Sequence, residues 1–121
     1  MTILMIGLCA LIATIGVATA ALGVLFDARE KAATAAEAAA LAAAVATYPP
    51  AGAGGPGDLA AEFASRNGAR LISCRCPVDA TLRSRVVSVS VVLTVDVPLF
   101  GEVKVGKTAR AEFEPRAWLG R

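Results

Sequence analysis

Hydrophobic and polar positions divide the chain into stretches of different periodicity, and the first stretch is apolar throughout. Residues 1–26 contain no charged side chain. This apolar run is long enough to cross a hydrocarbon core of about 30 Å as one helix. A cleaved signal peptide is the alternative, since Ala18-Thr19-Ala20 fits a small-residue cleavage pattern. The run lacks a basic segment before it and stays apolar beyond that pattern, which favours a retained anchor. We therefore expect residues 1–26 to form a transmembrane helix.

One side of this expected helix consists of small residues. They recur at alternating spacings of four and three, which places them on one face: Cys9, Ala13, Gly16, Ala20 and Gly23. In lipid, where packing drives helix association, small residues let another helix approach closely. Glycine and alanine are also frequent in membrane helices in general. Ala13, Gly16, Ala20 and Gly23 are our candidate helix-packing residues.

An alanine-rich stretch follows the apolar run. Residues 28–45 hold eleven alanines and neither glycine nor proline, so the membrane helix should continue through residues 27–48 without a break. Tyr48-Pro49-Pro50 should end it, because proline lacks the N–H that a helix needs. Two interpretations of this extension remain open. It is either a spacer or an assembly element whose thin alanine surface docks against neighbouring subunits.

A linker and a short helix come next. Residues 49–57 are rich in proline and glycine, which predicts a flexible linker. We expect a small domain over residues 58–121. Asp58 is a candidate N-cap for its first helix, and Asn67-Gly68 is a typical helix end.

Strict alternation then predicts strands. Over residues 86–97 valines and a leucine alternate with serine, threonine and aspartate, as in a half-buried strand. A second strand follows the tight connection at 98–101, and residues 70–76 supply a third. The predicted fold class is α+β: a long N-terminal membrane-spanning helix extended by the alanine-rich helix, then one short helix against a three-stranded antiparallel sheet. Such a domain has a minimal core.

Composition narrows the classes of function. Hydrophobic residues make up 56% of the 121 residues but aromatic residues only 5%. Charged residues are 18% of the chain, fewer than the roughly 25% of soluble proteins. A net charge of +2 provides no strong field for nucleic acid, and the absence of histidine removes the commonest general base and metal ligand. We expect a membrane-attached protein that is not an enzyme, with no cofactor, nucleic acid or small-molecule substrate.

Cys74-Arg75-Cys76 is the remaining group of residues whose side chains could carry chemistry. Thiols two residues apart on a strand share a face. Zinc would need further ligands, and Cys9 lies in the anchor, so we expect no metal site. A disulfide between Cys74 and Cys76, a bridge between subunits, and two thiols buried in the core all remain open.

Two segments carry a resemblance to a known family. Residues 35–42 read AAEAAALA directly after a membrane helix. This resembles the N-terminal region of TadE/TadG-like proteins of Flp (tight-adherence) pilus systems. Residues 67–74 read NGARLISC before a valine-rich strand. That is similar to the short actinobacterial TadE-like branch found beside helicase and secretion genes.

The resemblance implies a minor pilin or pseudopilin, or an assembly accessory of the pilus. It would be a single-pass cell-membrane protein with its C-terminal domain outside the cytoplasm, and its partners would be other pilins and the Tad assembly platform. One departure concerns leader processing: prepilins carry a glutamate five residues after the cleavage-site glycine, whereas Ile12 follows Gly7 at that distance. The alternative function is a stand-alone membrane-tethered binding module of the cell envelope.

Overall fold

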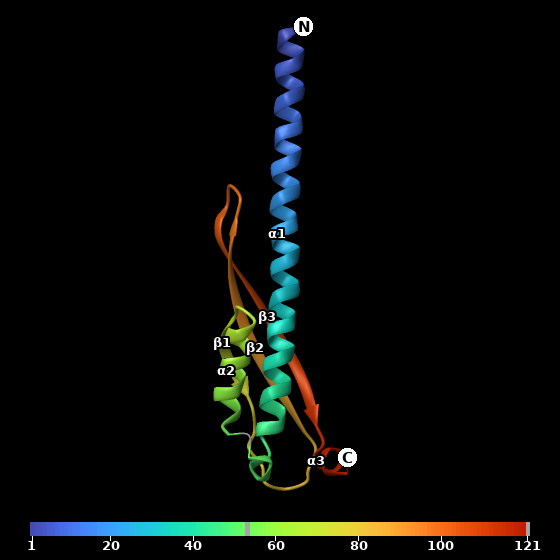
Figure 1. Ribbon diagram of the computed structural model, residues 1–121, viewed down its shortest axis with the longest axis vertical. Coiled ribbons are helices and arrows are strands. Elements are labelled where there is room, and N and C mark those ends of the chain that lie inside the picture. The colour runs from blue at the N-terminus through green and yellow to red at the C-terminus, as the bar shows by residue number, and fades with distance from the viewer. Residues whose placement is uncertain (53, 121) are drawn as a thin grey trace.

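One uninterrupted helix runs the length of the molecule, and a small sheet lies along its C-terminal half (Figure 1). The computed structural model describes residues 1–52 and 54–120; Ala53 of the predicted linker and Arg121 of the predicted domain lie outside the described residues. The elements in chain order are α1 (Thr2–Ala46), the 3₁₀ helix η1 (Pro49–Ala51), α2 (Pro56–Arg66), β1 (Arg70–Arg75), β2 (Arg85–Val97), β3 (Gly101–Phe113) and α3 (Pro115–Leu119).

The end of α1 follows from its local sequence. Thr47 is the C-cap residue, and its backbone N–H donates to the Ala43 carbonyl at 3.1 Å. The Thr47 hydroxyl donates to the Ala44 carbonyl at 2.6 Å. Two prolines follow, and neither can donate a backbone hydrogen bond to extend the helix. The predicted helix through the apolar and alanine-rich stretches is therefore confirmed as one element of 45 residues.

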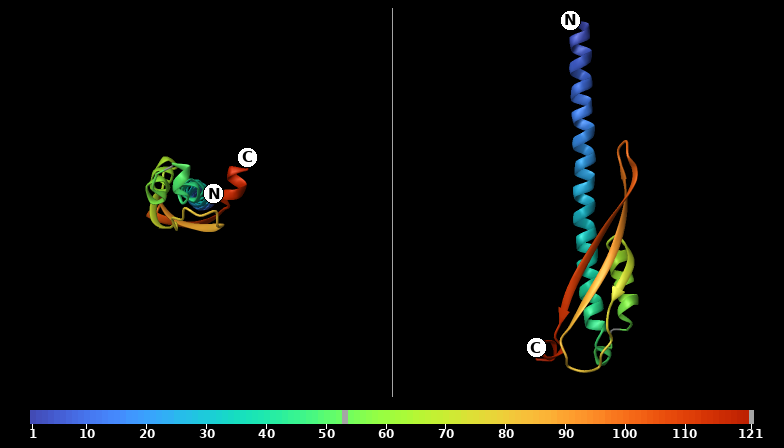
Figure 2. Two further views of the ribbon diagram at one scale, coloured as in Figure 1. Left: turned by 90° about the horizontal axis from the view of Figure 1, so that it is seen from below. Right: turned by 180° about the vertical axis from the view of Figure 1, so that it is seen from behind.

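The sheet has the predicted three antiparallel strands in the order β1-β2-β3. Strands β2 and β3 pair along their whole length, from Arg85 opposite Phe113 to Val97 opposite Gly101. The predicted alternation is confirmed, since Val87, Val89 and Val91 are fully buried. This long hairpin extends well past the short strand β1 (Figure 2).

The start of α2 differs from the prediction. The N-cap is Gly55, and Pro56 takes the first helical position, where its fixed φ suits a helix and its missing N–H would have had no partner in any case. Asp58 therefore lies inside the first turn, where its negative charge favours the helix N-terminus. The helix ends as predicted: Gly68 adopts φ +77°, and the Ala69 N–H donates to the Ala64 carbonyl at 2.9 Å.

The alanine-rich half of α1 forms the centre of the core. Its buried alanines contact α2 and both long strands, so two helices cover the sheet where the sequence predicted one (Figures 1 and 2). The buried set is Ala28, Ala32, Ala35, Ala36, Ala39, Ala40, Ala43 and Ala44. This stretch is thus not a spacer standing apart from the domain, and its alanine face is covered by its own chain.

Side-chain size explains this arrangement. Alanine carries a single methyl group, so the helix axis can approach the valine face of the sheet and the neighbouring α2 closely. The opposite side of α1 holds Glu30, Thr34, Glu37 and Leu41, all exposed. Alanine has the highest helix propensity, so one residue type satisfies both the helix and the packing. A core of this kind needs few aromatic residues, in agreement with the composition.

Candidate functional site

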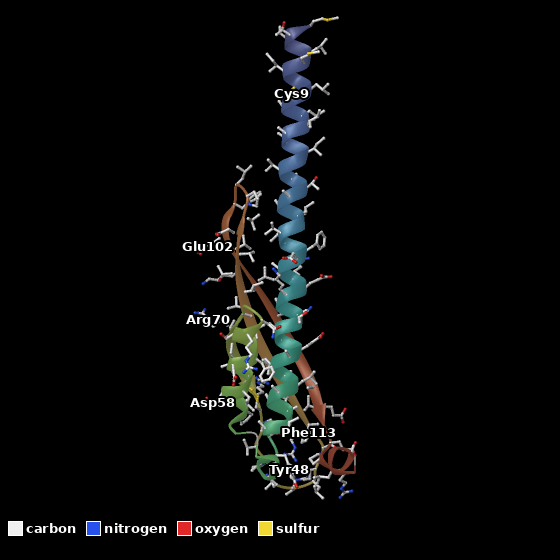
Figure 3. The ribbon with its side chains drawn as sticks, viewed as in Figure 1. Cys9, Tyr48, Asp58, Arg70, Glu102 and Phe113 are labelled. Carbon is white, nitrogen blue, oxygen red and sulfur yellow. A yellow bond between two sulfur atoms is a disulfide. The ribbon has the colours of Figure 1, made fainter. Side chains whose placement is uncertain are left out.

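The N-terminal half of α1 has a bare apolar surface. It contains an 18-residue stretch that is long and apolar enough to cross a membrane, and none of that stretch is buried within the chain. Large side chains such as Ile3, Leu8 and Leu11 are more than half exposed. An apolar surface of this extent requires a cover of lipid or of other protein. Figure 3 shows Cys9, a free thiol, on the part of α1 that extends beyond the hairpin.

The four predicted helix-packing residues lie on this surface, and three of them face open space. A Cβ placed on Gly16 or Gly23 would meet no described atom within 4 Å outside the local helix backbone, and Ala20 is exposed. Ala13 lies at the margin of this face, because it also lines a groove beside the hairpin tip. The small-residue face is therefore open to a neighbouring helix.

The tip of the β2–β3 hairpin lies alongside the apolar half of α1. Together they form a groove of about 340 Å³ lined by Ala13, Thr14, Val17, Ala18, Ala21, Leu99 and Phe100. A second groove, about 490 Å³, continues along Ala18, Ala21, Leu22, Leu25, Val97, Phe100 and Val103. The sequence predicted the tight turn. Its position beside the membrane helix was not predicted, because it depends on how far the paired strands extend past the core.

Arg85 is a buried charge that the sequence pattern did not reveal. Its side chain is only 8% exposed, and its guanidinium donates to the backbone carbonyls of Thr47, Asp79, Thr81 and Arg83. Thr47 is the C-cap of α1, so the positive charge also lies at the negative end of that helix. Arg85 thus joins the end of α1 to the loop between β1 and β2.

The same loop contains a short turn around Asp79. The Asp79 carboxylate accepts a hydrogen bond from the Thr81 backbone N–H at 2.8 Å, and this bond lowers the pKa of Asp79 below its ordinary value. The Asp79 N–H in turn donates to the Thr47 carbonyl at 2.8 Å. The loop is therefore held both by its own turn and by the end of α1.

Cys74 and Cys76 are joined by a bond between their Sγ atoms. Both side chains are partly buried against the core, at the end of β1. Within the described residues no group of three or more histidine, cysteine, aspartate or glutamate side chains is placed to hold a metal ion. The oxidation state of this pair in the cell stays a prediction.

The N-terminal helix also matches a known family. Residues 1–46 fit the family model described as putative Flp pilus-assembly TadE/G-like. Over these residues the helix is similar to that family. No curated protein and no solved structure matches the chain.

The TadE/G-like match ends where α1 ends, at Ala46. It therefore contains both the bare apolar surface and the alanine face that forms the core of the domain. The match confirms the resemblance over these residues, and the description of the matched family names Flp pilus assembly. The likeness of residues 67–74 to one actinobacterial branch stays a prediction.

Proposed function

We propose that this chain is a minor pilin or pseudopilin of a Tad (Flp) type IV pilus-like secretion system. The observation that carries the proposal is the TadE/G-like helix α1, half of which is bare and apolar while the other half is the core of a small domain. The bare half would lie in the cell membrane, with its small-residue face against the helices of other pilins or of the assembly platform. The role is structural, not enzymatic, and uses no cofactor.

The domain would lie outside the cytoplasm. The joined Cys74 and Cys76 support this compartment, because disulfides persist in oxidising surroundings and are rare in the cytosol. The residues after the membrane stretch are mixed in charge, with Asp27 and Glu30 beside Arg29 and Lys31. They therefore form no basic cluster that would hold this end in the cytoplasm.

Protease digestion of a C-terminal tag tests the compartment. We expect the tag to be digested in intact spheroplasts, since an outward domain is accessible from outside the cell membrane. A cytoplasmic marker protein should resist digestion in the same sample until the cells are lysed. Protection of the tag until lysis would place the domain in the cytoplasm and contradict the pilin proposal.

Gly16→Leu tests assembly through the small-residue face. The larger side chain should block close approach of a second helix, so the amount of chain recovered in sheared filaments or membrane complexes of the native host should fall about tenfold. Membrane insertion should be unchanged, because leucine is more apolar than glycine.

Gly7→Leu is the matched control for Gly16→Leu. Gly7 is also open, with no described atom within 4 Å of an added Cβ outside the local helix backbone, but its position in the helical repeat lies away from the small-residue face. We expect nearly normal assembly of Gly7→Leu. An equal loss in both variants, or a Gly16→Leu chain that fails to insert, would contradict the proposal. Normal assembly of Gly16→Leu would favour a stand-alone membrane-tethered module.

A further inference from the structure

The hairpin tip exposes two large apolar side chains where the structure gives them no partner in the core. Leu99 is 87% exposed and Phe100 is 75% exposed. The tip sequence 97–101 is uncharged, and it is flanked on the two strands by Asp96 and Glu102. Apolar residues bracketed by acids at the end of a hairpin need an explanation that the core of the domain does not supply.

The backbone of the turn makes this choice of residue unusual. Leu99 adopts φ +68°, after Pro98 and before Phe100, whose N–H donates to the Val97 carbonyl at 3.1 Å. This arrangement, with proline second and a positive φ third, is that of a type II turn, in which glycine is the relaxed choice for the third residue. An exposed leucine in that conformation is strained, so the apolar side chain is present despite the turn and not because of it.

The level of the tip along α1 gives the explanation. Leu99 and Phe100 share a groove with helix residues from Ala13 to Ala21, and the uncharged run of the helix continues to Phe26. If the membrane covered only the residues before Ala13, the exposed side chains of Ile15 and Phe26 would lie in water. A membrane that covers them also covers the level of the tip.

We propose that the hairpin tip, Leu99 and Phe100, inserts into the outer leaflet of the same lipid bilayer that α1 spans. The inference rests on the membrane anchoring proposed above and adds a second contact with lipid. The occupant is a lipid surface: acyl chains next to the headgroups, which take up the two apolar side chains.

The acids set the depth of insertion. Asp96 lies directly opposite Glu102 in the hairpin, and Figure 3 shows Glu102 beside the middle of α1. Their neighbours Val97 and Val103 line a groove with Leu22 and Leu25, close to Asp27 on the helix. The carboxylates of Asp27, Asp96 and Glu102 therefore lie near one level along α1, and this level would coincide with the lipid headgroups. Leu99, three residues further along, would reach about 10 Å deeper, within the depth of interfacial anchors.

The backbone of the tip is suited to this depth. Unpaired backbone groups are costly in hydrocarbon, but Pro98 has no N–H and the Phe100 N–H is already bonded within the turn. Val97 and Gly101 are paired across the strands. The tip therefore carries few unpaired donors into the acyl region.

Tryptophan reporters in vesicles test the proposal on the full chain. The single native tryptophan, Trp118, is replaced by phenylalanine, and one reporter is introduced at a time: Phe100→Trp at the tip, Ile12→Trp in the bare helix, or Val78→Trp in the exposed loop between β1 and β2 at the other end of the domain. Each chain is reconstituted at low density into phosphatidylcholine vesicles, plain or brominated near the top of the acyl chains.

We expect Phe100→Trp to lose about half of its emission in brominated vesicles, Ile12→Trp to be quenched as well, and Val78→Trp to keep its emission. Quenching of Ile12→Trp without quenching of Phe100→Trp would overturn tip insertion and leave the anchor intact; the tip would then face protein partners. Absence of quenching at Ile12→Trp would overturn the anchor and tip insertion together. Equal quenching of Val78→Trp and Phe100→Trp would also overturn the proposal, because the whole domain would then lie on the membrane.

Discussion

Replacing Arg85 by methionine should lower the free energy of unfolding of the domain by about 3 kcal/mol. Methionine retains much of the length of the side chain and removes the guanidinium. The carbonyls of Asp79 and Thr81 would lose the donor that they share, and the buried Thr47 carbonyl would keep only the Asp79 N–H; the loss of hydrogen bonds to a charged donor is costly. The end of α1 would also lose its compensating positive charge. For a domain of this size the midpoint of thermal unfolding should fall by about 15 °C.

Arg83→Met is the matched control for this prediction. Arg83 is exposed and contributes its backbone carbonyl to the Arg85 cluster, and that carbonyl survives the substitution. Differential scanning calorimetry of the full chain in detergent micelles measures both variants. If the midpoint of thermal unfolding fell by a similar amount in both variants, the positive charge of the loop, and not the buried hydrogen bonds of Arg85, would be what stabilises this end of the domain.

Ala39→Leu should destabilise the domain by about 2 kcal/mol, and by more if the sheet cannot shift. Ala39 is fully buried within the cluster that joins α1 to the rest of the core. A leucine adds three carbon atoms at a position where the helix lies close to its neighbours, so the helix must move or the side chain must leave its preferred rotamer. Helix propensity changes little, because alanine and leucine are both good helix formers.

Thr34→Leu provides the comparison on the same helix. Thr34 is exposed on the outward side of α1, so a leucine side chain has room there. The free energy of unfolding of Thr34→Leu should differ from that of the parent by less than about 0.5 kcal/mol. The same calorimetric measurement applies. If Ala39→Leu were as stable as Thr34→Leu, the alanine face would not be the close contact described above.

The sequence was most informative where one periodicity dominated. The charge-free run and the alanine-rich stretch predicted α1, and the alternation around Val87, Val89 and Val91 predicted the hairpin and its inward face. Prolines after Thr47 located the end of the long helix. In each case the residue pattern acts over neighbouring positions, which is why it can be interpreted without knowledge of the fold.

Features that depend on distant contacts were not predicted. Alanine is equally suited to an exposed and to a buried helix, so the pattern left open what covered the stretch from Ala28 to Ala44. An arginine that begins a strand looks like any exposed arginine until the carbonyls around Arg85 are placed. The groove between Leu99 and the membrane helix arises because β2 and β3 extend beyond the core, and strand length alone does not indicate what lies next to the tip. The small-residue face was located by spacing, but only the structure shows that Gly16, Ala20 and Gly23 are open while Ala13 lies at the margin, beside the hairpin tip.

The continuity of α1 ties the geometry of the domain to that of the membrane stretch. Each residue of an α-helix rises by about 1.5 Å along the helix axis and rotates the chain by roughly 100° about it. The number of residues between Gly23 and Ala28 therefore fixes the azimuth at which the sheet points relative to the small-residue face. If copies or related subunits pack through that face, this residue count fixes the side of the interface on which each domain lies, without a hinge to adjust it.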